Sequence, residues 1–165
     1  MSVNRASYVP SRLDWWFGES PTSCDATIRE ATAHDVDQIQ RMIRDAGGKV
    51  SRTRIRYWLS QNNYSVRLVS RNYRQAIALC VSRHGLDGNE ILHFVAPVFT
   101  VTHFPKVLPR LLTLAAAELP EALCRAVIKL SDESAGSVLR ASGWKLVRCD
   151  ESIDEAEFTF GPCVS

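Results

Sequence analysis

The sequence predicts a single α/β domain in which helices flank a central sheet. Its 165 residues are ordinary for one domain and suffice to bury a core without disulfides or a structural metal. Hydrophobic residues make up 45% and charged residues 23%, which is typical of globular proteins and excludes a disordered chain. Patterns typical of strands and helices alternate along the sequence, and this alternation predicts the α/β class.

The sequence predicts neither a membrane segment nor a metal site. No apolar run approaches the roughly 18 to 20 residues of a membrane-spanning helix, and Arg5, Arg12 and Asp14 interrupt the region where a signal peptide would be apolar. We therefore expect a cytoplasmic protein. The five cysteines show no CxxC motif and no zinc spacing, so we expect reduced thiols. They are Cys24, Cys80, Cys124, Cys149 and Cys163.

Residues 1–24 are predicted to form an N-terminal extension, and residues 25–165 the folded domain. The extension shows no sustained periodicity and contains three adjacent aromatic residues, Trp15-Trp16-Phe17. Because large aromatic rings are costly to leave in water, we expect them to pack on the domain or on a second copy of the chain. Packing on a second copy would form a homodimer.

The domain opens with a predicted strand and a helix. The strand covers Ala26–Glu30, and Thr32 followed by Asp35 is a helix N-cap signature. Apolar residues then recur at helical spacing as far as the stop signal Gly47-Gly48, which predicts a helix over Ala33–Ala46.

A second, short helix and three strands follow. Ser51 is expected to cap the helix, in which Ile55, Trp58 and Leu59 form an apolar stripe. Three β-rich runs separated by turn residues predict an antiparallel meander. These strands are expected at Tyr64–Ser70, Gln75–Arg83 and Glu90–Phe99.

The last part of the chain alternates helices and strands. An apolar helix begins at Val107 and ends near Glu118, and Leu123–Leu130 is expected to be a strand in a sheet buried on both faces. Ser131 or Asp132 can cap a further helix that ends at Gly143. Strands at Trp144–Cys149 and Glu155–Phe160 complete the predicted order.

This order of elements resembles the GNAT N-acetyltransferase superfamily over about residues 25–161. Ile28–Ile39 is similar to the opening strand and helix of that family, and Asp132–Trp144 is similar to its late helix ending in a Gly-aromatic pair. The resemblance implies the acyl-CoA N-acyltransferase fold, with a mixed, mostly antiparallel sheet that splays near Val95–Phe99. It also implies acetyl-CoA or another acyl-CoA as cofactor.

The resemblance places the cofactor at the end of the fourth strand. In the family a Gly-rich loop and the following helix start hold the pyrophosphate, but here the matching stretch Thr100–Pro105 contains no glycine. We expect the pantetheine arm along Phe94–Val98 and side-chain contacts to the phosphates from His103 and its neighbours. The predicted cofactor-binding residues are Phe94, Val95, Ala96, Val98, Thr100, Thr102, His103 and Lys106.

Candidate catalytic residues lie on the same strand. Glu90 and His93 are positioned to act as a base toward an amine. Many family members have a tyrosine as general acid four residues before the glycine of the Gly-aromatic pair, where this chain has Leu139. Leucine cannot donate a proton, so a water would have to relay it.

Charge is distributed unevenly along the chain. The net charge is only +2, but no acidic residue interrupts the span between Lys49 and Arg74, which contains seven Lys and Arg residues. This basic span has three interpretations: a solvated face, a dock for an acidic acceptor or protein, and a nucleic-acid surface. The low net charge and the lack of a recognition motif argue against nucleic acid.

Two functions remain from the sequence. The first is an N-acyltransferase that moves an acetyl or acyl group from acyl-CoA to a small-molecule or peptide amine, with an acidic acceptor as one option. The alternative is a GNAT-like module without catalysis that binds a ligand or a protein partner.

Overall fold

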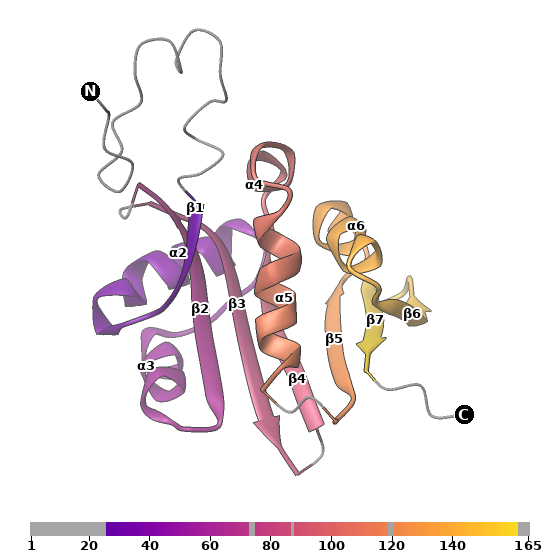
Figure 1. The fold of residues 1–165 in the computed structure, drawn as a ribbon, viewed down its shortest axis with the longest axis horizontal. Helices are drawn as coiled ribbons and strands as arrows, with labels where there is room; N and C mark the ends of the chain where they lie inside the picture. The colour runs from indigo at the N-terminus through magenta and orange to yellow at the C-terminus, as the bar shows by residue number, and fades with distance from the viewer. Residues whose placement is uncertain (1–25, 73–74, 87, 119–120, 162–165) are drawn as a thin grey trace, which may run out of the picture.

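The computed structural model describes residues 26–72, 75–86, 88–118 and 121–161. The aromatic cluster Trp15-Trp16-Phe17 and the boundary predicted after residue 24 lie outside these ranges. The described residues form a mixed sheet with helices on both faces (Figure 1), which confirms the predicted α/β class.

The described strands form one seven-stranded sheet in the order β1-β2-β3-β4-β5-β7-β6. All neighbouring strands are antiparallel except β4 and β5, which are parallel. The predicted meander and the mixed, mostly antiparallel sheet are therefore both confirmed. The strands are β1 (Ala26–Glu30), β2 (Tyr64–Arg71), β3 (Gln75–Gly85), β4 (Gly88–Val95), β5 (Cys124–Lys129), β6 (Lys145–Asp150) and β7 (Glu155–Phe160).

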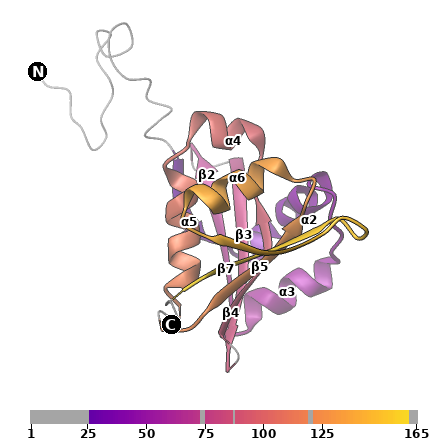
Figure 2. The same ribbon diagram turned by 90° about the vertical axis from the view of Figure 1, so that its right-hand side faces the viewer.

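Helices cover the two faces of the sheet as separate layers (Figure 2). One face packs on α2 (Val36–Asp45) and α3 (Arg52–Ser60), and the other on α5 (Val107–Ala116) and α6 (Glu133–Ala141). Each layer has its own cluster of buried apolar residues, which is the arrangement expected when amphipathic helices bury one stripe each. The short helix α4 (Val98–His103) lies at the end of the sheet where β4 stops.

The first helical segment begins where the sequence predicts, at a capping box. The Thr32 hydroxyl accepts from the backbone N–H of His34, and the Asp35 carboxylate accepts from the Thr32 N–H at 2.8 Å. A single 3-10 turn, Ala33–Asp35, precedes α2. The Arg29 guanidinium on β1 donates to both Asp35 carboxylate oxygens at 2.8 Å. The cap therefore also ties the helix layer to the edge strand.

Replacing Asp35 with alanine should lower the free energy of unfolding by about 2 kcal/mol, because it removes a helix cap and leaves a half-buried guanidinium without its carboxylate partner. The Arg29 hydrogen bond lowers the pKa of Asp35, so this stabilisation is present above the ordinary carboxyl pKa and is lost as the pH falls through the lowered value. Urea unfolding measures both effects. The matched control is Asp37→Ala, which breaks only the exposed pair with Arg52 and should cost less than about 0.5 kcal/mol.

Two sequence expectations about strands are wrong. The predicted strand Glu90–Phe99 ends at Val95, and α4 follows it, because Pro97 has the extended backbone of a helix N-cap and Thr100 turns inward to donate to the Ile77 carbonyl. The segment predicted to be buried on both faces is buried on one only. On β5, Arg125 is exposed and pairs with Glu90 and Glu157.

The described cysteines are free, as expected. Cys80 and Cys124 are buried, and burial raises the pKa of both thiols to about 12. Such thiols remain protonated and act as small apolar side chains. Within the described ranges no helix is long and apolar enough to cross a membrane, and no group of side chains has the composition of a metal site.

Candidate functional site

The parallel strands β4 and β5 diverge after a short paired region. Their register covers only Asn89↔Cys124, Glu90↔Arg125 and Ile91↔Ala126. Beyond Ile91, the β4 edge that faces β5 has no strand partner among the described residues. Backbone N–H and C=O groups on an unpaired edge are available to a ligand. This opening is the splay that the resemblance implies, and it begins earlier than the expected Val95–Phe99.

A β-bulge changes the side-chain pattern of β4 at the same point. Ile91 pairs with Ser82 and His93 with Val81, so Leu92 is an extra residue on β4. Ile91 and Phe94 join the cluster on the α5 and α6 side, whereas Leu92 packs on the α2 and α3 side. The His93 ring contacts the Trp58 ring of α3, with centroids 5.4 Å apart.

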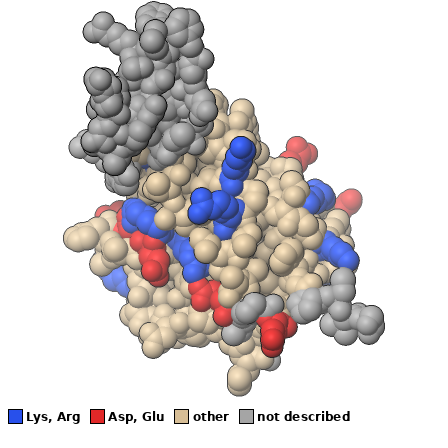
Figure 3. Space-filling model, viewed as in Figure 1, with Lys and Arg blue, Asp and Glu red and all other residues tan. Residues whose placement is uncertain are grey.

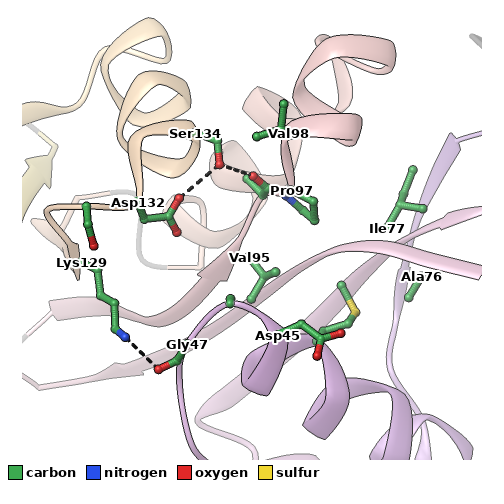
Figure 4. A pocket seen from close by; sticks show the side chains of 14 residues that line it. Asp45, Gly47, Ala76, Ile77, Val95, Pro97, Val98, Lys129, Asp132 and Ser134 are labelled. Atoms are coloured by element: carbon green, nitrogen blue, oxygen red, sulfur yellow. Dashed lines mark hydrogen bonds between the residues drawn. The ribbon is translucent and has the colours of Figure 1, made fainter.

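A cavity of about 630 Å³ lies at the end of this opening. Its walls come from the end of α2, the start of β3, the end of β4 and the start of α6 (Figure 4). The lining residues are Met42, Asp45, Ala46, Gly47, Ala76, Ile77, Val95, Ala96, Pro97, Val98, Lys129, Ser131, Asp132 and Ser134. Its volume suits a small molecule or the reactive end of a larger one.

Two hydrogen bonds join opposite walls of this cavity. Lys129 Nζ donates to the Gly47 carbonyl at 2.8 Å, and Ser134 Oγ donates to the Ala96 carbonyl at 2.6 Å (Figure 4). Asp132 caps α6 through the Ala135 N–H and also contacts Ser134 Oγ. Gly47 has φ +87°, a conformation that favours glycine and that presents its carbonyl to the lysine. The cavity is thus built from segments fixed by specific polar contacts.

A smaller cavity of about 190 Å³ adjoins the first, because both are lined by Ala46, Val95, Lys129 and Asp132. It lies between the diverging strands, and His93 is part of its lining. Burial lowers the pKa of His93, so the imidazole is neutral near pH 7. A neutral imidazole in a cavity is a chemically competent proton acceptor.

The two predicted catalytic residues have different surroundings. His93 lines the smaller cavity, whereas Glu90 lines neither. The Glu90 carboxylate pairs with Arg83 at 2.5 Å and with Arg125 at 3.1 Å, on the region where β4 and β5 are still paired. Of the two, His93 is the one that the structure brings to the cleft.

The predicted cofactor residues divide into two groups. Those up to Val98 surround the cavities: Phe94 lines the smaller one, Ala96 and Val98 the larger one, and Val95 both. Thr102, His103 and Lys106 are exposed and line neither. Thr100 is buried, and its hydroxyl donates a hydrogen bond to the Ile77 carbonyl.

Helix α4 occupies the place where the resemblance implies a phosphate-binding loop. Its Val101 N–H donates to the Pro97 carbonyl at 3.0 Å, and the Phe104 N–H to the Thr100 carbonyl at 2.8 Å. Pro105 and Pro109, next in the chain, have no N–H. A ring nitrogen of His103 is already hydrogen-bonded to the Phe99 carbonyl at 3.0 Å. The residues present therefore do not fit the diphosphate of acyl-CoA in the family's manner.

Leu139, at the position of the family's tyrosine, is fully buried in the core. Sequence reasoning missed Asp45, Lys129 and Ser134, and it interpreted Asp132 only as a helix cap and Gly47 only as a helix stop. A signal existed for Asp132, which begins the stretch that resembles the family's late helix.

The described basic residues between Lys49 and Arg74 do not line either cavity. Arg52 pairs with Asp37, Arg67 with Glu118, and Arg71 lies over the Phe99 ring. These contacts favour a partly paired surface over a single anion-binding site.

Comparison with solved structures identifies proteins of the same fold. A GNAT superfamily phosphinothricin acetyltransferase from Sinorhizobium meliloti, in complex with AcCoA, has a TM-score of 0.64 and 18% identity, over 82% of this chain and 88% of its own. The ribosomal-protein-S18-alanine N-acetyltransferase from Escherichia coli has a TM-score of 0.62 and 13% identity, over 81% and 90%.

A spermidine N-acetyltransferase mutant from Vibrio cholerae has a TM-score of 0.63 and 12% identity, over 83% of this chain and 94% of its own. No family model and no curated protein matches the sequence. At these identities the likeness concerns the fold, and the fold expected from the sequence is confirmed.

Proposed function

Because the chain has the fold of the GNAT superfamily, we propose that it is an N-acyltransferase that moves an acyl group from a thioester to an amine. The observation that carries the proposal is the divergence of β4 and β5, which opens two adjoining cavities beside a neutral histidine. The fold by itself does not identify a reaction, since one fold hosts many functions. The polar residues at this cleft are the specific support for acyl transfer to an amine.

In this proposal the unpaired edge of β4 holds the thioester end of the donor. Phe94, Val95 and Ala96 supply the backbone groups, and the apolar side chains of the cleft exclude water. Since α4 leaves no cradle for a diphosphate, the donor is held through its thioester and pantetheine part. Acyl-CoA binding is accordingly expected to be modest and sensitive to salt through Lys106 and its neighbours.

His93 is proposed to accept the proton of the amine. The free amine then attacks the thioester carbonyl carbon, the C–N bond forms, the C–S bond breaks, and the leaving thiolate takes up the proton that the nitrogen loses as it becomes an amide. Because burial lowers the pKa of His93, the imidazole stays unprotonated at pH values just below the ordinary histidine pKa. Glu90 remains a second candidate base, although its carboxylate is held by Arg83 and Arg125.

The acceptor is proposed to be a cationic amine. Asp45 and Asp132 line the larger cavity, while its one lysine, Lys129, donates to the Gly47 carbonyl. Two carboxylates attract an ammonium-bearing molecule and disfavour the acidic acceptor considered from the sequence. The basic residues of α3 lie elsewhere.

A transfer assay tests the proposal. The purified chain is incubated with acetyl-CoA, S-acetylpantetheine or S-acetyl-N-acetylcysteamine and one of three amines that correspond to the structural neighbours: spermidine, an alanine N-terminal peptide or phosphinothricin. Mass spectrometry should detect acetylated amine, with spermidine the best acceptor.

If no donor and acceptor pair yields product above the uncatalysed rate, the alternative of a binding module without catalysis holds instead. Two features favour this alternative: α4 stands where the family has its phosphate-binding loop, and the buried Leu139 stands where it has the general-acid tyrosine. Under that alternative, spermidine or pantetheine would still raise the melting temperature, because both would occupy the cleft of the folded state.

A further inference from the structure

An aromatic and basic surface on and beside α4 lies outside the two cavities of the proposed site. We call it the Phe99 patch, formed by Arg71, Phe99, His103 and Phe104. The Phe99 ring is 44% exposed and stacks on the His103 ring, with centroids 4.3 Å apart. The Arg71 guanidinium lies 5.6 Å from the Phe99 ring centroid and 6.0 Å from that of the buried Phe104. Exposed stacked rings of this kind often mark a contact surface.

The patch carries positive charge and an unsatisfied donor. The Arg71 Nε atom is buried and makes no hydrogen bond in the described part of the chain. No acidic residue occurs between Ile91 and Ala117, whereas Lys106 and Arg110 are both exposed there. Figure 3 shows Lys and Arg atoms over the α4 and α5 layer, with Asp and Glu atoms only at its margins. A partner with aromatic rings and carboxylates complements such a surface.

The start of the described chain lies next to this patch. Ala26, the first residue of β1, pairs in register with Arg71. Facing residues of antiparallel strands have Cα atoms only about 5 Å apart, so the chain enters β1 beside the Arg71 backbone. From Ala26 back to Phe17 the chain can span up to about 30 Å.

We propose that the Asp14–Glu19 segment of the same chain docks on the Phe99 patch. This segment reads Asp-Trp-Trp-Phe-Gly-Glu, so its three aromatic residues lie between two carboxylates. The rings stack on Phe99 and His103, and a carboxylate accepts from Arg71. Intramolecular docking is favoured over a separate partner because the short connection gives a high effective concentration. The inference is independent of the proposed catalysis.

A double-mutant cycle in the full chain tests the docking. One variant is Phe99→Ala, and the other replaces Trp15, Trp16 and Phe17 with alanine. Phe99→Ala should lower the melting temperature by about 3 °C more in the natural chain than in the triple variant, because the docking contact is already absent in the latter. The control Leu146→Ala, at a residue 40% exposed on β6, should give equal shifts in both backgrounds.

Sedimentation of all four proteins accompanies the melting curves. Coupling in a monomer whose melting temperature is independent of concentration supports docking within one chain. Equal shifts for Phe99→Ala in both backgrounds overturn the proposal. Coupling that vanishes on dilution, together with a mass that halves in the triple variant, also overturns it and identifies a second copy as the occupant.

Discussion

Replacing Ala46 with tryptophan should reduce acyl transfer at least 100-fold while the fold remains intact. Ala46 lines both cavities and is itself exposed at the end of α2, so a large side chain there can enter the cleft without displacing the core. The steady-state rate with S-acetylpantetheine measures the loss. Calorimetry with the same donor should show that binding is lost in parallel.

The chain offers a closely matched control. Ala117 is also exposed, also ends a helix, and has nearly the same backbone conformation, but it lines neither cavity. Ala117→Trp should leave activity within about twofold of the natural chain. If both tryptophans reduce activity equally, the effect is unspecific, and the cleft is not the site. If neither does, the reaction takes place elsewhere on the molecule.

The variant His93→Gln should lower kcat about 100-fold or more, which is the usual contribution of a positioned general base. In the natural chain kcat/KM should fall only when the pH drops below about 6.5, because partial burial of His93 holds its pKa below the ordinary value. The variant should have a low rate whose pH profile lacks this fall at acidic pH, the acid limb. Loss of the limb distinguishes proton transfer from a structural role in the contact with Trp58.

His34→Gln is the control, because His34 is exposed at the first helical turn and lines neither cavity. It should retain the natural rate and pH profile. A His93→Gln variant with unchanged kcat would assign the base to another group, and Glu90→Gln would then be the next variant to measure.

The strand and helix order could be predicted because it depends on local patterns. The strand expected at Glu155–Phe160 has the observed bounds, and the helix expected after Ser51 begins at Arg52. Both follow from residues close together in the sequence, a periodic apolar face and a capping hydroxyl. Local information sufficed wherever the tertiary contacts agreed with it.

Helix α4 could not be predicted, because its β-branched residues favour a strand. The segment is held as a helix by a contact between residues distant in sequence, the hydrogen bond from Thr100 to the Ile77 carbonyl, and by burial of Phe104. Local propensity is a weak preference that such tertiary contacts can override.

Only part of the candidate site could be predicted from the sequence. The end of β4 was predicted from its resemblance to a known family, and Val95 and Ala96 do line the cleft. Asp45, Lys129 and Ser134 come from three other segments, and their contacts depend on how α2, β5 and α6 meet. No spacing within one segment could reveal them.

The central claim is that the cleft takes the thioester end of the donor without a tight hold on nucleotide phosphates. Its most direct test is the ratio of kcat/KM for acetyl-CoA to that for S-acetylpantetheine at two salt concentrations. The structure predicts a ratio below about ten that shrinks with salt, because only exposed side chains near α4 can meet the phosphates. A salt-independent ratio above about one thousand would show a tight phosphate site and contradict this account.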